Sequence, residues 1–585
     1  MPDILLIQPP ICDFYLTAKR TIPYGLSCIA ASVMEGGYSV EILDALASGR
    51  SKKMGLPPEM SLLRDFYTED ISPFSMFHDF KRFGLSADTI GERVKNSGAF
   101  LVGISSLFTA YSGEAVRMAE LVKSLCPEAV IVLGGHHPTE MPEEALSHDC
   151  VDFIIRGEGE EAMVLLARAV RGEGSFEFVP GIGFRTSSGR LFIKPPAVLT
   201  NLDHVPFPAI ELIDNGFYQR RKKPGAVIVA GRGCPLCCSY CSIGCSSWCG
   251  FRMKSARRVI EEMKRAVFGV GARFIDFEDE NISFDKQWFL DLLDRIAQEF
   301  GGCGLELRAM NGLFPPTLDE EVICAMKAAG FTALNLSLCT TNREQLKRFR
   351  RPDVRREFES ALWCAGKHGL DAVAYIIAGA PGQNPLDSVA DLLYLAGKSA
   401  IAGVSVFYPA PGSADFEECA VRNLLPPALS QLRSTALPVS DTTTREDSIT
   451  LLRLGRILNF FKSLDASNRE EVMNLAKEYA KQKLPETIPV SQTEYGVDTH
   501  AGKRRAVGKI LLAFFLRDAV IHGLSPEGRL FRHRASETLC RKFRNGMLKV
   551  FSTRSRIMVR TSRALKEDRT DGRGERGLMP SRVED

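Results

Sequence analysis

Residues 231–250 read G-R-G-C-P-L-C-C-S-Y-C-S-I-G-C-S-S-W-C-G, the most cysteine-rich stretch of the chain. Within it, Cys234, Cys238 and Cys241 stand at C-x3-C-x2-C spacing. Three thiolates on one short loop suit three irons of a cubic 4Fe–4S cluster, whereas clusters that only transfer electrons usually carry four Cys ligands. The fourth iron would then be open to a small molecule, with the ring of Tyr240 beside it. The spacing therefore predicts a cluster that takes part in chemistry.

The remaining cysteines of this stretch leave two alternatives open. Paired C-x2-C units are typical of zinc sites, but the pairs at 234–237 and 238–241 are fused, so one short segment cannot easily surround a tetrahedral ion from both. A disulfide framework does not suit a long chain without a secretory signal. We interpret Cys237, Cys245 and Cys249 as bystanders rather than ligands.

The C-x3-C-x2-C spacing resembles that of the radical S-adenosylmethionine (SAM) superfamily. The longer string R-G-C-P-L-C-C-S-Y-C-S (232–242) looks like the cobalamin-binding branch of that superfamily. The resemblance implies that the amino and carboxylate groups of SAM chelate the open iron. It also implies that one electron from the cluster cleaves SAM to methionine and a 5′-deoxyadenosyl radical.

The composition of the whole chain is that of an ordinary globular protein. Its 585 residues allow about two to four domains, and a net charge of +3 gives no global field for nucleic acid or a membrane surface. The 16 Cys, mostly scattered singly outside the cluster stretch, suit a reducing compartment. The start M-P-D-I-L-L-I-Q-P-P lacks a signal-peptide pattern, and the apolar run 510–516 is too short to span a bilayer. We expect a cytoplasmic protein.

The N-terminal third alternates between short apolar runs and stretches with helical spacing. The runs that we expect to be strands are 4–7, 39–43, 101–105, 130–133 and 153–155. Strands separated by helices predict a doubly wound, flavodoxin/Rossmann-like parallel sheet. Ligands of such sheets bind at the C-terminal ends of the strands. The loops at those ends include Q-P-P, S-S-L-F-T, G-G-H-H-P and G-E-G-E.

This ordered series of strand-end loops resembles the cobalamin-binding domain that precedes many radical SAM modules, and it implies such a domain over residues 1–170. The positions that match the family's cobalamin contacts are Ser105, Ser106, Gly134, Gly135 and Glu158. Domains that ligate cobalt through a protein His carry D-x-H-x-x-G after the first strand, where this chain has P-I-C-D-F-Y-L. The resemblance therefore implies a cobalt without that His ligand; His136 or His137 remains an alternative, and a loop or corrin-amide contact is their simpler interpretation.

A Pro-interrupted linker is expected over 171–224, followed by a second alternation of strands and helices over 225–440. The expected strands are 226–230, 274–277, 305–310, 333–338, 372–378 and 403–408. This pattern resembles the open six-stranded radical SAM barrel, a partial (β/α)6 barrel, whose active site lies at the C-terminal strand ends.

By the same resemblance, several strand-end residues bind SAM. These are Tyr240, Glu278, Asp279, Asn281, Asn335, Ser337, Gly379, Pro381 and Gly382. Acidic residues after a strand also cap the following helix, which is the interpretation that we prefer for Asp285. Tyr375 and Tyr408 are alternatives for hydrogen relay, although tyrosines are common inside barrels.

Beyond the barrel, residues 441–530 have helical spacing, and 531–585 are basic and polar, which predicts a disordered tail. A basic tail is also compatible with RNA binding, but it has few aromatic residues and no recognisable RNA-binding module. No nucleic-acid partner is expected.

The family resemblance implies a cobalamin-dependent radical SAM enzyme that uses a 4Fe–4S cluster, SAM and cobalamin. Its adenosyl radical would abstract hydrogen from an unactivated carbon of a small-molecule substrate, which methylcobalamin would then methylate. A flavodoxin- or ferredoxin-type electron donor is implied. Alternatives are a ring-forming or oxidative cyclase-like radical SAM enzyme, a tRNA methylthiolating enzyme, and a non-catalytic cobalamin- or iron–sulfur-binding protein.

Overall fold

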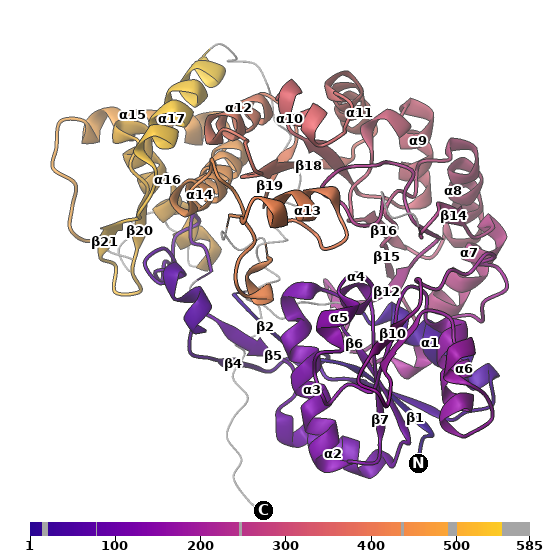
Figure 1. The fold of residues 1–585 in the computed structure, drawn as a ribbon. Helices are drawn as coiled ribbons and strands as arrows, with labels where there is room; N and C mark the ends of the chain where they lie inside the picture. The colour runs from indigo at the N-terminus through magenta and orange to yellow at the C-terminus, as the bar shows by residue number, and fades with distance from the viewer. Residues whose placement is uncertain (15–21, 78, 245–247, 434–437, 489–499, 553–585) are drawn as a thin grey trace, which may run out of the picture.

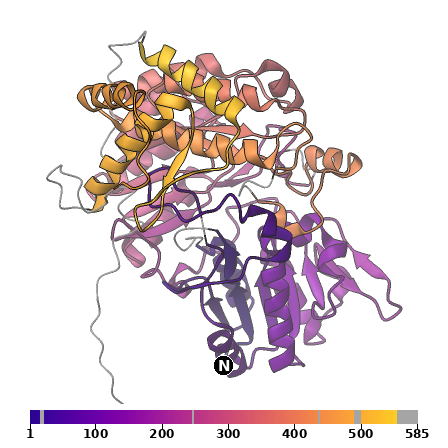
Figure 2. The same ribbon diagram turned by 90° about the vertical axis from the view of Figure 1, so that its left-hand side faces the viewer.

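The computed structural model describes residues 1–14, 22–77, 79–244, 248–433, 438–488 and 500–552. Two α/β units and a helical C-terminal layer make up the molecule (Figure 1). The N-terminal unit lies below the other two in both views (Figure 2). No helix among the described residues is long and apolar enough to cross a membrane.

The N-terminal unit is built on five parallel strands in the order β3-β1-β6-β7-β8. These strands are β1 (Ile4–Gln8), β3 (Val40–Asp44), β6 (Leu101–Ser105), β7 (Val130–Gly134) and β8 (Phe153–Ile155). Helices α1 (Tyr24–Glu35) and α6 (Glu160–Val170) cover one face, and α2 (Ala87–Ser97) and α3 (Ser112–Leu125) cover the other. Because both faces are covered, the strands are near-continuous apolar runs. The predicted doubly wound sheet is confirmed.

The sheet continues into the segment that we expected to be a linker. Strands β9 (Ile182–Arg185) and β10 (Leu191–Ile193) add to the β8 edge as an antiparallel hairpin. Phe184 packs against Phe153 of β8, and Gly189 adopts φ +79° in the turn. The strands of this hairpin have only three and four residues, too short to be predicted from a segment of irregular composition. Because the hairpin joins the sheet, the N-terminal unit extends past residue 170.

The second unit contains six parallel barrel strands, as predicted. They are β12 (Lys223–Ile228), β15 (Phe274–Phe277), β16 (Glu306–Ala309), β17 (Ala333–Cys339), β18 (Asp371–Ala378) and β19 (Ile401–Val406). Parallel bridges Leu307–Phe331 and Leu313–Leu336 join the two halves of the barrel. The outer helices are α7 (Ala256–Lys264), α8 (Lys286–Phe300), α9 (Glu320–Ala329), α11 (Arg355–Lys367) and α12 (Pro385–Ala396). The Asp285 side chain caps α8 by accepting from the Trp288 N–H at 3.0 Å.

The long connection between β3 and β6 forms a small unit of its own. Its strands β4 (Ser51–Lys53) and β5 (Lys81–Phe83) pair with β2 (Ile11–Asp13) in an antiparallel sheet. The 3-10 helix η1 (Pro58–Leu63) lies between β4 and β5 in the sequence. An aromatic cluster around Phe14, Tyr67 and Phe80 packs against Ile449 of helix α14 (Arg445–Ser463). This connection therefore joins the N-terminal unit to the C-terminal layer.

The C-terminal layer contains α14, α15 (Ala466–Tyr479), α16 (His500–Asp518), hairpin β20 (His522–Leu524) with β21 (Leu530–Arg532), and α17 (Glu537–Ser552). The expectation of a disordered tail from residue 531 is wrong for 537–552, where Leu539, Phe543 and Met547 are buried at helical spacing. Residues 553–585 lie outside the described residues.

Candidate functional site

The cysteine-rich stretch forms a loop closed at its base by two short antiparallel strands, β13 (Gly231–Arg232) and β14 (Arg252–Met253). Cys238 is buried, and Cys234 and Cys241 are half-buried. Burial raises the pKa of Cys234, and the negative charges of Cys241 and Cys238 raise it further. The three thiols are thus gathered within electrostatic reach of one another.

The other cysteines of the loop differ in their surroundings. Cys237 is exposed, and Cys249 is buried beside the Arg252 guanidinium, at 3.7 Å. Cys245 lies outside the described residues. In the described part of the chain no three His, Cys, Asp or Glu side chains lie close enough to share one metal ion, so the cluster ligands Cys234, Cys238 and Cys241 stay a prediction from their spacing.

Polar groups from neighbouring strands surround the three thiols. The Asn281 amide donates to Cys234 Sγ at 3.8 Å, and its buried Oδ1 has no hydrogen-bond partner in the structure. Arg351 donates to Cys238 Sγ at 3.6 Å and to the Tyr240 hydroxyl at 2.9 Å. Three thiols, N–H donors to two of them and an unpartnered amide oxygen fit a negatively charged cluster with a polar ligand on an open iron.

Asp279, a predicted SAM contact, holds the backbone at the start of the cysteine loop. Its buried carboxylate accepts hydrogen bonds from the backbone N–H groups of Ala230 (3.1 Å) and Gly231 (2.6 Å). Burial raises the pKa of Asp279 to about 7. The side chain therefore fixes the entry of the cysteine loop. Glu278 is half-buried at the end of β15, where its backbone carbonyl accepts from Asn311 at 2.8 Å.

The other predicted SAM residues lie at the remaining strand ends. Asn335 is buried, donates to the Ala309 carbonyl at 3.0 Å and accepts from the Tyr375 hydroxyl at 3.4 Å, so it ties β16 to β17 and β18. The Ser337 carbonyl accepts from Arg351, which brings this strand end to the cysteine loop.

The G-A-P-G loop after β18 is held from outside by the segment that leads into α14. Gly382 N–H donates to Asp441 at 2.8 Å, and the Ser440 hydroxyl donates to the Ala380 carbonyl at 3.2 Å. Gly379 and Gly382 have φ +82° and +69°, which favours glycine at both positions. Pro381 is buried between them.

Small residues gather where β6 and β7 end in the N-terminal unit. A side chain at Gly134 would meet nothing within 4 Å, whereas one at Gly135, with φ +122°, would lie 2.6 Å from the Ser106 carbonyl oxygen. The buried Ser106 hydroxyl has no hydrogen-bond partner in the structure, and Ser105 is half-buried beside it. Open space next to an unpartnered hydroxyl fits a ligand group that approaches the backbone closely, as the cobalamin prediction requires.

The two histidines that follow this edge are not equivalent. His137 is buried, and its Nε2 lies 2.7 Å from Glu144 Oε2. His136 is half-buried, and burial lowers its pKa. The carboxylate partner gives His137 a structural role within the N-terminal unit.

Glu158, a predicted cobalamin contact, joins the two units through ion pairs. Its buried carboxylate lies 2.7 Å from Arg252 and 3.2 Å from Arg232, the residues at the base of the cysteine loop. Although burial raises the pKa of Glu158, the two arginines lower it below its ordinary value. The carboxylate thus forms an ion pair with two arginines from a segment far away in the sequence, and the cobalamin contact at Glu158 stays a prediction.

A second contact joins the cysteine loop to the edge of the N-terminal sheet. Trp248 Nε1 donates to Glu140 at 3.2 Å. Glu140 ends α4 (His136–Glu140), the short helix that follows β7. The end of β7 and the cysteine loop thus face each other across one interface.

Comparison with protein families identifies both units. Residues 77–167 match the B12 binding domain, and residues 228–393 match the radical SAM superfamily. The chain therefore combines a B12 binding domain with a radical SAM domain, the pair that the sequence resemblance predicts. The two matched regions contain the predicted cobalamin positions and the predicted cluster and SAM positions respectively.

Relatives of this radical SAM chain include enzymes with different reactions. It is 26% identical to cytidylyl-2-hydroxyethylphosphonate methyltransferase from Streptomyces wedmorensis over 472 residues, 74% of this chain and 84% of that protein. It is 28% identical to the anaerobic magnesium-protoporphyrin IX monomethyl ester cyclase of Rubrivivax gelatinosus over 290 residues, 48% of this chain and 50% of that one. The radical SAM methyltransferase TsrM from Kitasatospora setae has a similar fold, with a TM-score of 0.55 at 19% identity over 72% of this chain and 76% of that one.

Arg351 is the residue of this radical SAM site that sequence reasoning missed. It lies in the string R-F-R-R-P (348–352), and the local sequence does not distinguish Arg351 from the neighbouring arginines. Arg351 reaches the cysteine loop, while Arg348 lies near Glu418 at 3.3 Å. Only the contacts made on folding distinguish the two.

Proposed function

We propose that this chain is a cobalamin-dependent radical SAM methyltransferase that acts on an unactivated carbon of a small molecule. The observation that carries the proposal is the interface between the two units. The ion pairs of Glu158 with Arg232 and Arg252 and the Trp248–Glu140 hydrogen bond hold the cysteine loop against the cobalamin edge. A methyl donor and a radical generator must both reach one substrate carbon, and this interface supports that arrangement.

Each part of the site has a role under this proposal. Cys234, Cys238 and Cys241 would hold the cluster, and Asn281 Oδ1 and Tyr240 would contact SAM at its open side. Ser105, Ser106, Gly134 and Gly135 would form the cobalamin cradle. When bound, the cluster supplies the electron that cleaves SAM, and cobalamin supplies the methyl group. The residues of the chain then orient these groups and exclude water.

The proposal extends to partners and location. A low-potential electron donor of the flavodoxin or ferredoxin type would reduce the cluster. A cytoplasmic location is part of the proposal, supported by the many cysteines scattered through the chain.

An anaerobic assay tests the function. Full-length protein is reconstituted with iron, sulfide and hydroxocobalamin, reduced, and given SAM. We expect it to retain cobalamin and to form 5′-deoxyadenosine and S-adenosylhomocysteine, the second because methyl transfer from SAM leaves that product. The variant Cys238→Ala should form no 5′-deoxyadenosine.

The pattern of products separates the alternatives. Formation of 5′-deoxyadenosine without S-adenosylhomocysteine would favour cyclase-like chemistry. Absence of both products, with cobalamin and iron retained, would favour a non-catalytic binding protein and contradict the proposal.

A further inference from the structure

A cleft lies where three distant segments meet: η1, the residues 424–431 and 438–439, and the start of α14. Two adjoining cavities of about 580 and 490 Å³ occupy it, and both are lined by Ser61, Leu62 and Arg445. These volumes suit a small molecule.

The walls of this cleft reach both predicted cofactor regions. Val439, which lines the second cavity, packs in the same apolar cluster as Tyr240 of the cysteine loop. Gln431, from another wall, donates to the Glu59 carbonyl at 2.7 Å. Arg433, two residues further on, donates to the Ala110 carbonyl at 2.9 Å, just beyond the end of β6. The walls of the cleft are thus connected to the apolar cluster that contains Tyr240 and to the segment that follows β6.

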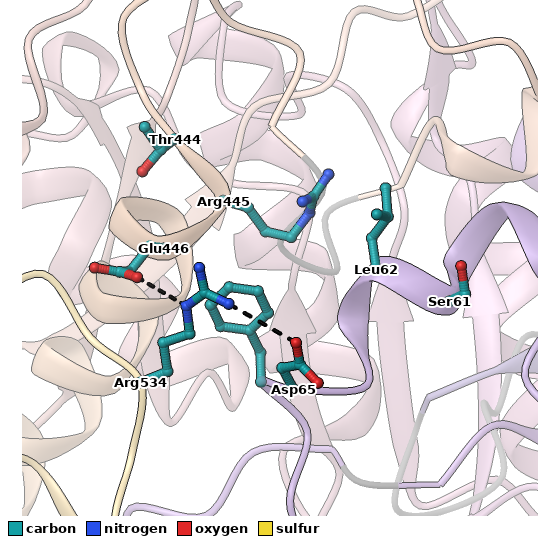
Figure 3. A pocket seen from close by; sticks show the side chains of 8 residues that line it. Ser61, Leu62, Asp65, Thr444, Arg445, Glu446 and Arg534 are labelled. Carbon is teal, nitrogen blue, oxygen red and sulfur yellow. Dashed lines mark hydrogen bonds and ion pairs between the residues drawn. The ribbon is translucent and has the colours of Figure 1, made fainter.

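Two arginines, Arg445 and Arg534, and three acidic residues, Asp65, Glu446 and Glu59, line the cleft. Arg534 is already paired, at 3.0 Å from Glu446 and 3.8 Å from Asp65, and its guanidinium lies 4.8 Å from the centre of the Phe66 ring. Arg445 reaches from the start of α14 into the space beside Leu62 (Figure 3), and its buried Nε has no hydrogen-bond partner in the structure. The two acidic residues of the first cavity are thus engaged by Arg534, and among the described residues neither of them pairs with Arg445.

The surroundings of Arg445 disfavour its own charge. Burial lowers the pKa of Arg445, and the positive charge of Arg534 lowers it further. A guanidinium that is partly buried, repelled by a second cation and unpaired gains from an anion with planar or tetrahedral oxygen geometry.

We propose that Arg445 binds an anionic group of the substrate, a carboxylate or a phosphate ester, whose apolar portion lies over Leu62. This proposal rests on the proposed function, since it names the substrate class of that site. Leu62 is 54% exposed and offers the apolar surface next to the guanidinium. The anion would be held at the outer end of the cleft, with the reacting carbon toward Val439.

The test measures binding of two anions, phenyl phosphate and benzoate, and of neutral benzyl alcohol, by equilibrium dialysis with the reconstituted full-length protein. We expect the anion that matches the substrate's group to bind about tenfold or more tightly than benzyl alcohol, since a charge-assisted hydrogen bond contributes that much. Tighter binding of phenyl phosphate would indicate a phosphate ester, and tighter binding of benzoate a carboxylate.

Three variants locate the binding site. Arg445→Gln should weaken anion binding about tenfold, and Arg445→Lys, which keeps the charge, should retain part of it. The control Arg295→Gln removes an exposed arginine from α8, paired with Asp291 at 3.0 Å, and should leave binding unchanged.

Three results would each overturn the proposal. The first is equal anion binding by Arg445→Gln and the wild type, the second is no anion binding at all, and the third is binding of benzyl alcohol as tight as that of the anions. SAM cleavage by the wild-type protein is measured separately. If the wild-type protein does not cleave SAM, the proposed function is wrong, whereas the dialysis result still decides whether Arg445 binds an anion.

Discussion

At the residue scale, Arg351 links a predicted cluster ligand, an aromatic residue and a barrel strand through one guanidinium. It donates to Cys238 Sγ, to the Tyr240 hydroxyl and to the Ser337 carbonyl. N–H donors to cluster sulfurs are among the features that set the reduction potential of a cluster. A positive charge at this position favours the reduced, more negative form.

Replacing Arg351 by Met should therefore lower the midpoint potential of the reconstituted cluster. A hydrogen bond to a charged group contributes about 1.5–3 kcal/mol, which for a one-electron couple corresponds to roughly 60–130 mV. A redox titration followed by electron paramagnetic resonance measures the shift. The matched variant Lys347→Met removes an exposed cation that pairs with Glu344 at 2.9 Å on α10 (Arg343–Arg348) and should leave the potential unchanged. An unshifted potential in Arg351→Met would show that this contact does not form in the loaded protein.

Single residues divide into those that a local pattern identifies and those that it cannot. The C-x3-C-x2-C spacing predicts Cys234, Cys238 and Cys241 as ligands because the ligands of one cluster can lie on one short loop. Glu158 sits at the expected strand end, yet its carboxylate pairs with Arg232 and Arg252, more than seventy positions further along the chain. A pattern within the G-E-G-E loop carries no information about those two arginines, so these ion pairs could not be predicted.

At the element scale, the ion pairs between the G-E-G-E loop and strands β13 and β14 fix the orientation of the two units. Replacing Glu158 by Gln leaves Arg232 and Arg252 without this buried carboxylate. Loss of one partner of a buried pair costs about 3–5 kcal/mol. Glu160, which also pairs with Arg232, retains part of the interface.

We expect Glu158→Gln to lower the free energy of unfolding by about 3 kcal/mol, as measured by urea denaturation. It should also reduce formation of S-adenosylhomocysteine more than cobalamin retention, since both cofactor sites persist while their relative position loosens. Glu261→Gln, at an exposed pair with Lys264, is the control and should change stability by less than about 1 kcal/mol. Equal stability of the Glu158 and Glu261 variants would contradict a structural role for the interface.

Helix α14 contains a buried lysine that makes stability depend on pH. Lys462 donates to the carbonyl oxygens of Leu395, in the last turn of α12, and Ala400. Burial lowers the pKa of Lys462 from 10.5 to about 7. Between these two values the unfolded chain binds a proton that the folded chain does not, so stability should rise with pH.

The expected slope for Lys462 is at most about 1.4 kcal/mol per pH unit between pH 7 and 9. Urea denaturation at pH 7, 8 and 9 measures it, with Lys462→Met expected to flatten the dependence. Lys477→Met on α15 should leave the slope as it is. A wild-type protein whose stability does not rise across this range would show that Lys462 keeps its proton on folding.

Elements were predictable where their apolar pattern is long or bounded by clear breakers. The five N-terminal strands and six barrel strands are buried runs flanked by Gly, Pro and polar loops, which is why the doubly wound sheet and the partial (β/α)6 barrel could be expected. Hairpin β9–β10 has strands of three and four residues, and α17 has Leu539, Phe543 and Met547 spaced within a strongly basic segment. In both cases packing against a distant surface outweighs a weak local signal.

At the scale of the whole molecule, a buried network of polar side chains joins the connection at 50–98, helix α14 and hairpin β20–β21. Arg453 of α14 donates to the backbone carbonyls of Phe66 and Phe74, and its NH1 lies 3.0 Å from His533 Nε2. His533 Nε2 lies 3.0 Å from Asp70, whose other oxygen accepts from the backbone N–H groups of Ser72 and Leu524. Burial lowers the pKa of His533 to about 4, so Arg453 and Asp70 carry the charges near neutral pH.

Replacing Asp70 by Asn removes the carboxylate that balances Arg453 in this buried group, and the cost should be about 3–5 kcal/mol of unfolding free energy. Because Asp70 anchors the connection at 50–98 to the C-terminal hairpin, Asp70→Asn should also make that connection more susceptible to limited proteolysis. Asp291→Asn, at an exposed pair with Arg295 on α8, should be close to wild type in both measurements.

Since η1 in this connection forms one wall of the proposed anion cleft, Asp70→Asn should weaken phenyl phosphate or benzoate binding even though Asp70 lies outside the cleft. If Asp70→Asn leaves stability, proteolysis and anion binding unchanged, the connection is held by its aromatic contacts with α14 instead.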